Sequence, residues 1–200
     1  MIDKNKIKEG DIILFHTKGL SPISIGIRSL TQSFWNHVGM VAENVFKKQS
    51  VIEALGRGVV ITPLDKYIGN KNYILKVVRL RPEAFKDEQE YTDGLATAIE
   101  RLREAVGTPY DWWAITWLGI KYSIRAFWNK GTKYLPERFN PFQSRYKFFC
   151  SKLVCVACYQ ISSKQDYLFQ GNTKQDCSST TPRDISKSSN CYYITGIDKN

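Results

Sequence analysis

Long apolar runs are absent from this chain. No segment approaches the roughly 18 consecutive apolar residues of a membrane-spanning helix, and the N-terminal sequence MIDKNKIKEGDIILF contains no apolar stretch of signal-peptide length. The most apolar long segment, WWAITWLGI at residues 112–120, is flanked by charged residues. These absences predict a soluble, cytoplasmic protein.

Clusters of basic residues are also absent. Lys and Arg outnumber Asp and Glu by 29 to 19, and the net charge of +10 would suit an anionic partner such as nucleic acid, lipid headgroups or a cell-wall polymer. Because no run of basic residues concentrates this charge, we interpret it as spread over the surface. We expect no nucleic-acid partner. A membrane surface is a less favoured partner, suggested by the aromatic and basic segment 112–130.

Histidines are few, and the cysteines are odd in number. Five cysteines argue against a full disulfide framework. Cys150, Cys155 and Cys158 have the C-x4-C-x2-C spacing of plant-type iron–sulfur proteins, but the residues between them continue a helical pattern that would separate the first two by about 140°. Neither of the 2 histidines is near them in sequence, which disfavours zinc. We therefore expect no metal or organic cofactor and interpret Cys155 and Cys158 as small core residues.

The pattern of apolar residues predicts an α+β protein. Its length of 200 residues suits one domain, or one domain with a long insertion. Strands clustered between Asp11 and Leu80, with helices around them, favour this class over a doubly wound parallel sheet. We expect strands at residues 10–15, 36–42, 49–55, 56–64, 73–81 and 191–197, helices at 21–31, 87–106, 112–128 and 150–160, and loop over the polar residues 162–190.

Cys150 lies where the extended, aromatic sequence YKFF meets the predicted helix. A thiol at a helix N-terminus meets unpaired backbone N–H groups and the positive end of the helix dipole, both of which favour the thiolate. The same N–H groups can bind an oxyanion after attack on a carbonyl. The alternative is a cysteine that only begins a buried helix.

His37 and Glu53 are the candidate partners of this cysteine. A cysteine nucleophile needs a general base, usually histidine, and a carboxylate inside the apolar strand SVIEA is costly to bury alone. If the two strands pair as a hairpin, Glu53 stands opposite residue 39, and His37 is its diagonal neighbour, about 7–8 Å away between Cα atoms. Glu53 would then orient one ring nitrogen and leave the other for Cys150. The alternatives are a backbone carbonyl for His37, and Arg57 or solvent for Glu53.

Several segments resemble one known family. GDIILF, NHVGMV, VIEA with GVVITPL after it, GTPYDWW, FFCSKLV and TTPRDIS follow the order of the YiiX-like permuted papain-like hydrolases. These form the circularly permuted branch of the NlpC-type superfamily, with poxvirus relatives and lecithin:retinol acyltransferase, in which the histidine strand precedes the cysteine helix. The resemblance implies a single domain over 1–200, with a variable insertion at about 114–145. It implies an antiparallel sheet or small barrel packed against helices that include the cysteine helix.

The resemblance also implies the catalytic residues. Cys150 matches the nucleophile in the family's CS-LV motif, His37 matches the base in HVG, and Glu53 matches the residue that orients the base. Tyr110 and Asp111 match the PYD turn near the cleft and are expected to bind substrate; alternatively, Asp111 caps the following helix.

The chain departs from the family pattern at two positions. Lys152 stands where an acidic residue is frequent, and Asn36 stands where a small hydroxyl residue is common. The Lys152 ammonium would favour the thiolate and change which substrates bind, so we count Lys152 among the substrate-binding residues.

The implied function is that of a cysteine hydrolase, an amidase or peptidase that forms an acyl-enzyme on amide bonds of peptides, including cell-wall peptides and lysine isopeptides. One alternative is a lipid-acting acyltransferase or thiol lipase, suggested by segment 112–130. Another is a non-enzymatic binding module, suggested by the charge of +10. The sequence leaves the scissile bond and the oligomeric state open.

Overall fold

A computed structural model describes residues 3–18, 33–43, 48–114, 116–117, 147–169 and 177–194 of the chain. The helix predicted at 21–31, most of the helix predicted at 112–128 and nearly all of the insertion predicted at 114–145 lie outside these residues. In the described part of the chain, no helix combines the length and the apolar character needed to cross a membrane.

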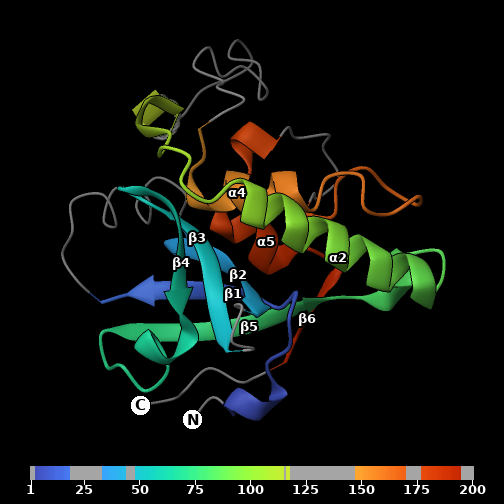
Figure 1. Cartoon of the computed structure of the whole chain (residues 1–200), viewed down its shortest axis with the longest axis horizontal. Coiled ribbons are helices and arrows are strands. Elements are labelled where there is room, and N and C mark those ends of the chain that lie inside the picture. The colour runs from blue at the N-terminus through green and yellow to red at the C-terminus, as the bar shows by residue number, and fades with distance from the viewer. Residues whose placement is uncertain are drawn as a thin grey trace, which may run out of the picture.

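The described strands form one antiparallel sheet in the order β4-β3-β2-β1-β5-β6 (Figure 1). Helices α2, α4 and α5 lie together on one side of it (Figure 1). This arrangement confirms the α+β class, and the strands occur close to where the apolar runs predict them. The bounds are β1 Ile12–Thr17, β2 His37–Glu43, β3 Gln49–Leu55, β4 Gly58–Pro63, β5 Tyr73–Leu80, β6 Cys191–Tyr193, α2 Glu88–Glu104, α4 Cys150–Ala157 and α5 Pro182–Lys187, with short 3-10 helices η1 Lys4–Lys6, η2 Leu64–Lys66, η3 Pro82–Ala84 and η5 Cys177–Ser179.

Both faces of the sheet are buried, in two separate cores. Successive strand residues point to opposite faces, so Ile12 and Leu14 pack in the core that contains α2, α4 and Cys150. Ile13 and Phe15 pack in a second core on the other face. This double burial explains why strand β1 is a continuous apolar run rather than an alternating one.

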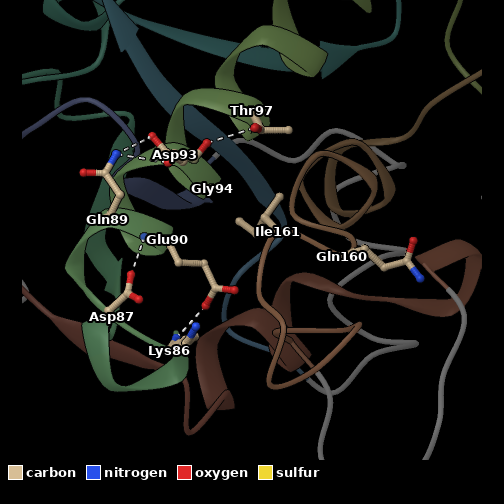
Figure 2. Close-up of a pocket in the computed structure, with 9 residues that line it drawn as sticks. All are labelled: Lys86, Asp87, Gln89, Glu90, Asp93, Gly94, Thr97, Gln160 and Ile161. Atoms are coloured by element: carbon tan, nitrogen blue, oxygen red, sulfur yellow. Dashed lines mark hydrogen bonds between the residues drawn. The ribbon is translucent and has the colours of Figure 1, made fainter.

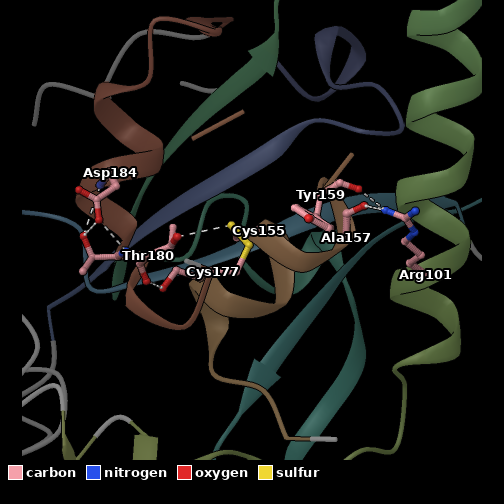
Figure 3. Close-up of a disulfide and its surroundings, with 9 residues drawn as sticks. Arg101, Cys155, Ala157, Tyr159, Cys177, Thr180 and Asp184 are labelled. Atoms are coloured by element: carbon pink, nitrogen blue, oxygen red, sulfur yellow. Dashed lines mark hydrogen bonds between the residues drawn. A yellow bond between two sulfur atoms is a disulfide. The ribbon is translucent and has the colours of Figure 1, made fainter. Parts of the chain in front are cut away.

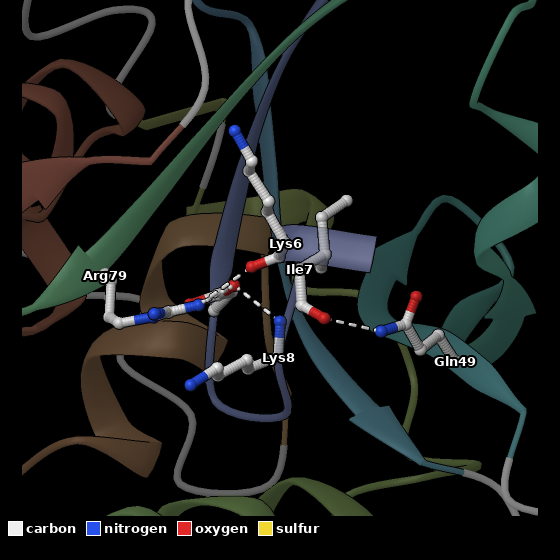
Figure 4. A network of polar contacts seen from close by, with 6 residues as sticks. Lys6, Ile7, Lys8, Gln49 and Arg79 are labelled. Carbon is white, nitrogen blue, oxygen red and sulfur yellow. Dashed lines mark hydrogen bonds and ion pairs between the residues drawn. The ribbon is translucent and has the colours of Figure 1, made fainter. Parts of the chain in front are cut away.

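The N-terminal segment is bound to the sheet by an ion pair whose carboxylate is buried (Figure 4). Arg79 donates from Nε and Nη2 to the carboxylate of Asp11, at 2.6 and 2.9 Å, and from Nη2 to the carbonyl of Lys6. Asp11 also accepts from the backbone N–H of Lys8 at 2.7 Å. These hydrogen bonds satisfy a carboxylate that has no exposed surface.

A disulfide joins Cys155 of α4 to Cys177 of η5, with their Cα atoms 5.4 Å apart (Figure 3). Cys155 is buried, as predicted, but the interpretation of it as a simple core residue was wrong. The neighbouring segment is held further because Ser151 Oγ donates to the carbonyl of Thr180 at 2.6 Å. Cys158 is a free buried thiol, as predicted.

Helix α5 lies inside the segment predicted as loop, which is a correction. Its start is a capping box in which the Thr181 hydroxyl and the Asp184 carboxylate accept from each other's backbone N–H groups, with Pro182 at the first helical position. The helix spans 6 residues, and within it only Pro182 and Ile185 are buried. A helix this short has too few apolar residues to show a helical period in the sequence. The capping residues in TTPRD are the one sequence signal of its start.

Candidate active site

His37 and Glu53 meet across neighbouring strands. The β2–β3 register pairs Met40 with Ile52 and Val41 with Val51, which puts residue 39 opposite Glu53, as the sequence predicts. His37 Nε2 lies 2.6 Å from Glu53 Oε2. The Glu53 side chain has no exposed surface, whereas 18% of the His37 side chain is exposed. The Glu53 carboxylate therefore lies inside the protein, and the His37 ring lies between this carboxylate and the solvent.

Gly39 leaves room for this pair. A Cβ atom at Gly39 would lie 2.5 Å from Val51 Cγ1 and 3.1 Å from Glu53 Cβ. Both distances are shorter than ordinary van der Waals contacts. A side chain at position 39 would push against Glu53. The lack of space therefore explains why the HVG sequence has glycine at this position.

Cys150 is the first residue of α4, directly after the extended Phe149. Phe149 gives no side-chain cap, so the N–H groups of the first turn are not satisfied by a capping side chain. The Cys150 side chain lies close enough to His37 to raise the pKa of the ring. Its surface is only 2% exposed, so the sulfur is nearly covered.

Electrostatics favours a charged ring at this position. Burial alone would lower the pKa of His37, but the neighbouring Cys150 and Glu53 side chains, the latter through a hydrogen bond, raise it to about 10. Burial alone would raise the pKa of Glu53, but the hydrogen bond and charge of His37 lower it. An imidazolium beside an ionised carboxylate is therefore the favoured state at neutral pH.

Tyr67 is a site residue that sequence reasoning missed. Its hydroxyl donates to Glu53 Oε1 at 2.5 Å, so each oxygen of the carboxylate has a partner. Tyr67 follows η2 and reaches Glu53 because the chain turns back after β4. The local sequence DKYIGN has no pattern that marks this contact, which depends on tertiary structure alone.

Asp111 and Lys152 bind each other behind the start of α4. Lys152 Nζ lies 3.3 Å from Asp111 Oδ2 and donates to the carbonyl of Lys147 at 2.9 Å. Asp111 Oδ1 accepts from the backbone N–H of Ala114 at 3.2 Å, which is the capping role considered as the alternative. The pair links the PYD turn to the first turn of α4, and a direct contact of either residue with substrate remains a prediction.

Tyr110 lies between this turn and the cysteine. It forms a parallel bridge with Phe148 and packs against Trp112, with ring centroids 4.8 Å apart. Burial and the charges of Cys150 and Asp111 raise the pKa of Tyr110 well above its ordinary value. A neutral phenol therefore lies close to Cys150, beside the indole ring of Trp112, which is partly exposed to solvent.

A shallow groove lies elsewhere, along the N-terminal part of α2 (Figure 2). Glu90 accepts there from the backbone N–H groups of Lys86 and Ser163, and Asp93 accepts from the Gln89 amide. The groove contains none of the candidate catalytic residues. Its carboxylates stabilise the start of α2 and its contact with the loop after α4.

The fold is that of the papain-like class in permuted order. Residues 6–115, more than half of the 200 residues, match the family of permuted papain-like amidase enzymes that includes YaeF and YiiX, peptidase family C92. The chain belongs to this family. The matched residues include His37, Glu53, Tyr110 and Asp111 and end before Cys150. The predicted family is confirmed.

The structure is also similar to a crystal structure of the metalloprotein YiiX from Escherichia coli O157:H7. The TM-score is 0.59 at 19% identity, over 95% of this chain and 97% of the other. At this identity the similarity shows the fold, and it confirms the predicted permuted papain-like architecture. In the described ranges of the present chain, no three His, Cys, Asp or Glu side chains are grouped to hold a metal ion. The curated proteins gave no match.

Proposed function

We propose that this protein is a cysteine hydrolase that cleaves amide bonds of peptides through an acyl-enzyme on Cys150. The observation that carries the proposal is the position of His37, which binds the buried Glu53 carboxylate through Nε2 and interacts with the Cys150 thiol. Nδ1 is then the ring nitrogen available to the sulfur. The contact of base and orienting acid, with the cysteine close to the base, supports the arrangement that thiol hydrolysis needs.

The reaction begins with attack of the Cys150 thiolate on the carbonyl carbon of the substrate. The tetrahedral intermediate collapses as the C–N bond breaks, and the His37 imidazolium gives its proton to the departing amine. The neutral ring then takes a proton from water, whose oxygen attacks the thioester. The acid product leaves, and the proton on His37 restores the imidazolium–thiolate pair.

The oxyanion would be bound at the start of α4. The backbone N–H of Cys150 is the first donor, because the first turn of a helix leaves such groups unpaired. The Tyr110 phenol is the proposed second donor, because the Tyr110 backbone pairs with Phe148, two residues before Cys150, and its raised pKa keeps the hydroxyl protonated. The buried Lys152–Asp111 pair would support both by holding the PYD turn against α4.

Substrate must reach a sulfur that is nearly covered in the free protein. Binding therefore has to move residues around Cys150 before attack, and a small alkylating agent should react sooner than a folded protein. Peptide chains or cell-wall peptide fragments, including lysine isopeptides, are the proposed substrates because the chain belongs to a family of amidases. The exposed indoles of Trp112 and Trp113 favour an apolar group beside the scissile bond, and a lipid acyl chain is the second candidate.

Selective alkylation tests the proposal. Iodoacetamide at limiting concentration, followed by peptide mass spectrometry, should label Cys150 faster than Cys158 and Cys191, whose thiol pKa values are raised by burial. His37→Ala should remove this preference, and Cys191→Ala is the matched control. Equal labelling of the free cysteines would contradict a catalytic thiol and favour a binding module. Wild type and Cys150→Ala should then be compared on peptide anilides, isopeptides and lipid esters.

A further inference from the structure

The Glu53 carboxylate is held from two sides inside the protein. His37 Nε2 contacts Oε2 at 2.6 Å, and the Tyr67 hydroxyl donates to Oε1 at 2.5 Å. The hydroxyl of Thr62 lies close enough to lower the pKa of Glu53 further, but it makes no hydrogen bond. Among the described residues, Tyr67 is therefore the neutral donor that completes the solvation of this anion.

The position of the Tyr67 ring is fixed by aromatic packing. Its centroid lies 4.8 Å from that of Phe15 and 5.0 Å from that of Tyr73, both in edge-to-face geometry. Phe15 also contacts the His37 ring, with the centroids 5.1 Å apart. Tyr67 is 4% exposed, so water does not easily replace its hydroxyl. The same aromatic cluster thus supports both His37 and Tyr67, the donor to the Glu53 carboxylate.

We propose that Tyr67 is a positioning residue that keeps Glu53 ionised and directed at His37, and so sets the acid limit of Cys150 reactivity. This inference rests on the proposed function. Without the hydroxyl, Oε1 would be a buried carboxylate oxygen with no donor, and burial would favour the protonated acid. A neutral Glu53 no longer stabilises the imidazolium, and the thiolate loses its counter-charge.

Few other titratable groups among the described residues lie near the Glu53 carboxylate. His37 from β2 and Tyr67 from the segment after η2 face it directly, whereas Tyr73 from β5 faces Tyr67 and Cys150 from α4 faces His37. Burial raises the pKa of Tyr67, and the charge and hydrogen bond of Glu53 raise it further, so Tyr67 is protonated throughout the pH range of interest. Its effect is therefore that of a fixed donor.

A carboxyl titration tests the link without any substrate. The Glu53 side-chain carbon should be followed by 13C NMR from acid to neutral pH in wild type, Tyr67→Phe and Tyr73→Phe. Tyr67→Phe keeps the ring and should raise the Glu53 pKa by about one unit, the size expected for losing a hydrogen bond to a charged group. Tyr73→Phe makes the same chemical change in the same cluster and should leave the Glu53 pKa in place.

The pH profile of Cys150 alkylation tests the consequence for the thiol. Its acid limb should move up by about one pH unit in Tyr67→Phe, about tenfold in rate at a fixed pH on the limb, and stay in place in Tyr73→Phe. An unmoved carboxyl titration in Tyr67→Phe, or an equal shift in Tyr73→Phe, would overturn the inference. If the carboxyl shifts but Cys150 is unreactive in every variant, the proposed function fails, and the control of Cys150 by Tyr67 is overturned with it.

Discussion

The Nζ atom of Lys152 lies 3.3 Å from Oδ2 of Asp111, and both side chains are almost fully buried. Lys152 lies two residues after Cys150 on α4 and also donates to the carbonyl of Lys147. The lysine that departs from the family pattern is thus matched by an acid from the PYD turn. Replacing one partner alone leaves an uncompensated charge inside the protein.

Lys152→Met should therefore lower the free energy of unfolding by about 3–5 kcal/mol, measured by urea denaturation. Lys152→Met with Asp111→Asn should regain part of this loss, because the asparagine oxygen still caps Ala114 and carries no charge. Lys71→Met at an exposed turn is the matched control and should change stability by less than about 0.5 kcal/mol. Equal effects at Lys152 and Lys71 would contradict the buried pair.

Gly39→Ala should disturb the His37–Glu53 pair by overpacking. The added methyl group would meet Val51 at 2.5 Å, and relief of such a clash typically costs about 1–3 kcal/mol. We expect lower stability and slower alkylation of Cys150 in the same variant. Adding Val51→Ala should restore much of the alkylation rate, and Val51→Ala alone serves as its control. No rescue would show that the clash with Val51 is not the cause.

Removing the disulfide should destabilise the protein. Cys155 and Cys177 are 22 residues apart, and closing a loop of this size stabilises by about 3 kcal/mol in the chain-entropy estimate. Thermal unfolding of wild type should shift down on addition of a dithiol reductant. The Cys155→Ser, Cys177→Ser double variant should already unfold at the lower temperature and should not respond to reductant. A response of the double variant would point to another cause.

The stability contributed by His37 should depend on pH with a defined sign. Its pKa of about 10 in the folded protein lies above the ordinary 6.5, so its contribution is complete below about pH 6.5 and is lost as the pH rises through about 10. The difference in unfolding free energy between wild type and His37→Gln should narrow over this range. His16→Gln controls for loss of a histidine. A difference that stays constant with pH would contradict the raised pKa.

Glu53 should act at the opposite end of the pH scale. Its pKa is lowered from 4.5, so its contribution is present above about pH 4.5 and is lost as the pH falls through the lowered value. Glu53→Gln should remove that acid-side dependence while keeping the volume of the side chain. Urea denaturation at several pH values between 3 and 6 would measure this dependence. If the unfolding free energy changed equally with pH in wild type and Glu53→Gln, the effect would be excluded.

The part of the site that depends on strand geometry was predictable from the sequence. A period of two along each strand and one hairpin register bring Glu53 and His37 together, and a carboxylate among apolar residues indicates that it has a partner. The strands were predictable for the same reason, since each is an apolar run bounded by turn residues. The contacts of Tyr67 and Cys177 were not predictable, because each joins segments through turns whose path only the folded chain defines.

The catalytic candidates are divided between the two cores. Cys150 belongs to the layer formed with α2 and α4, whereas Phe15 and Tyr67, which hold His37 and Glu53, belong to the opposite layer. The sulfur and the imidazole consequently stay close to each other only while both layers keep their packing. Under mild denaturant, the enhanced nucleophilicity of the thiol should fade before the circular dichroism of the backbone does, so chemical reactivity would report the earliest loosening of the molecule.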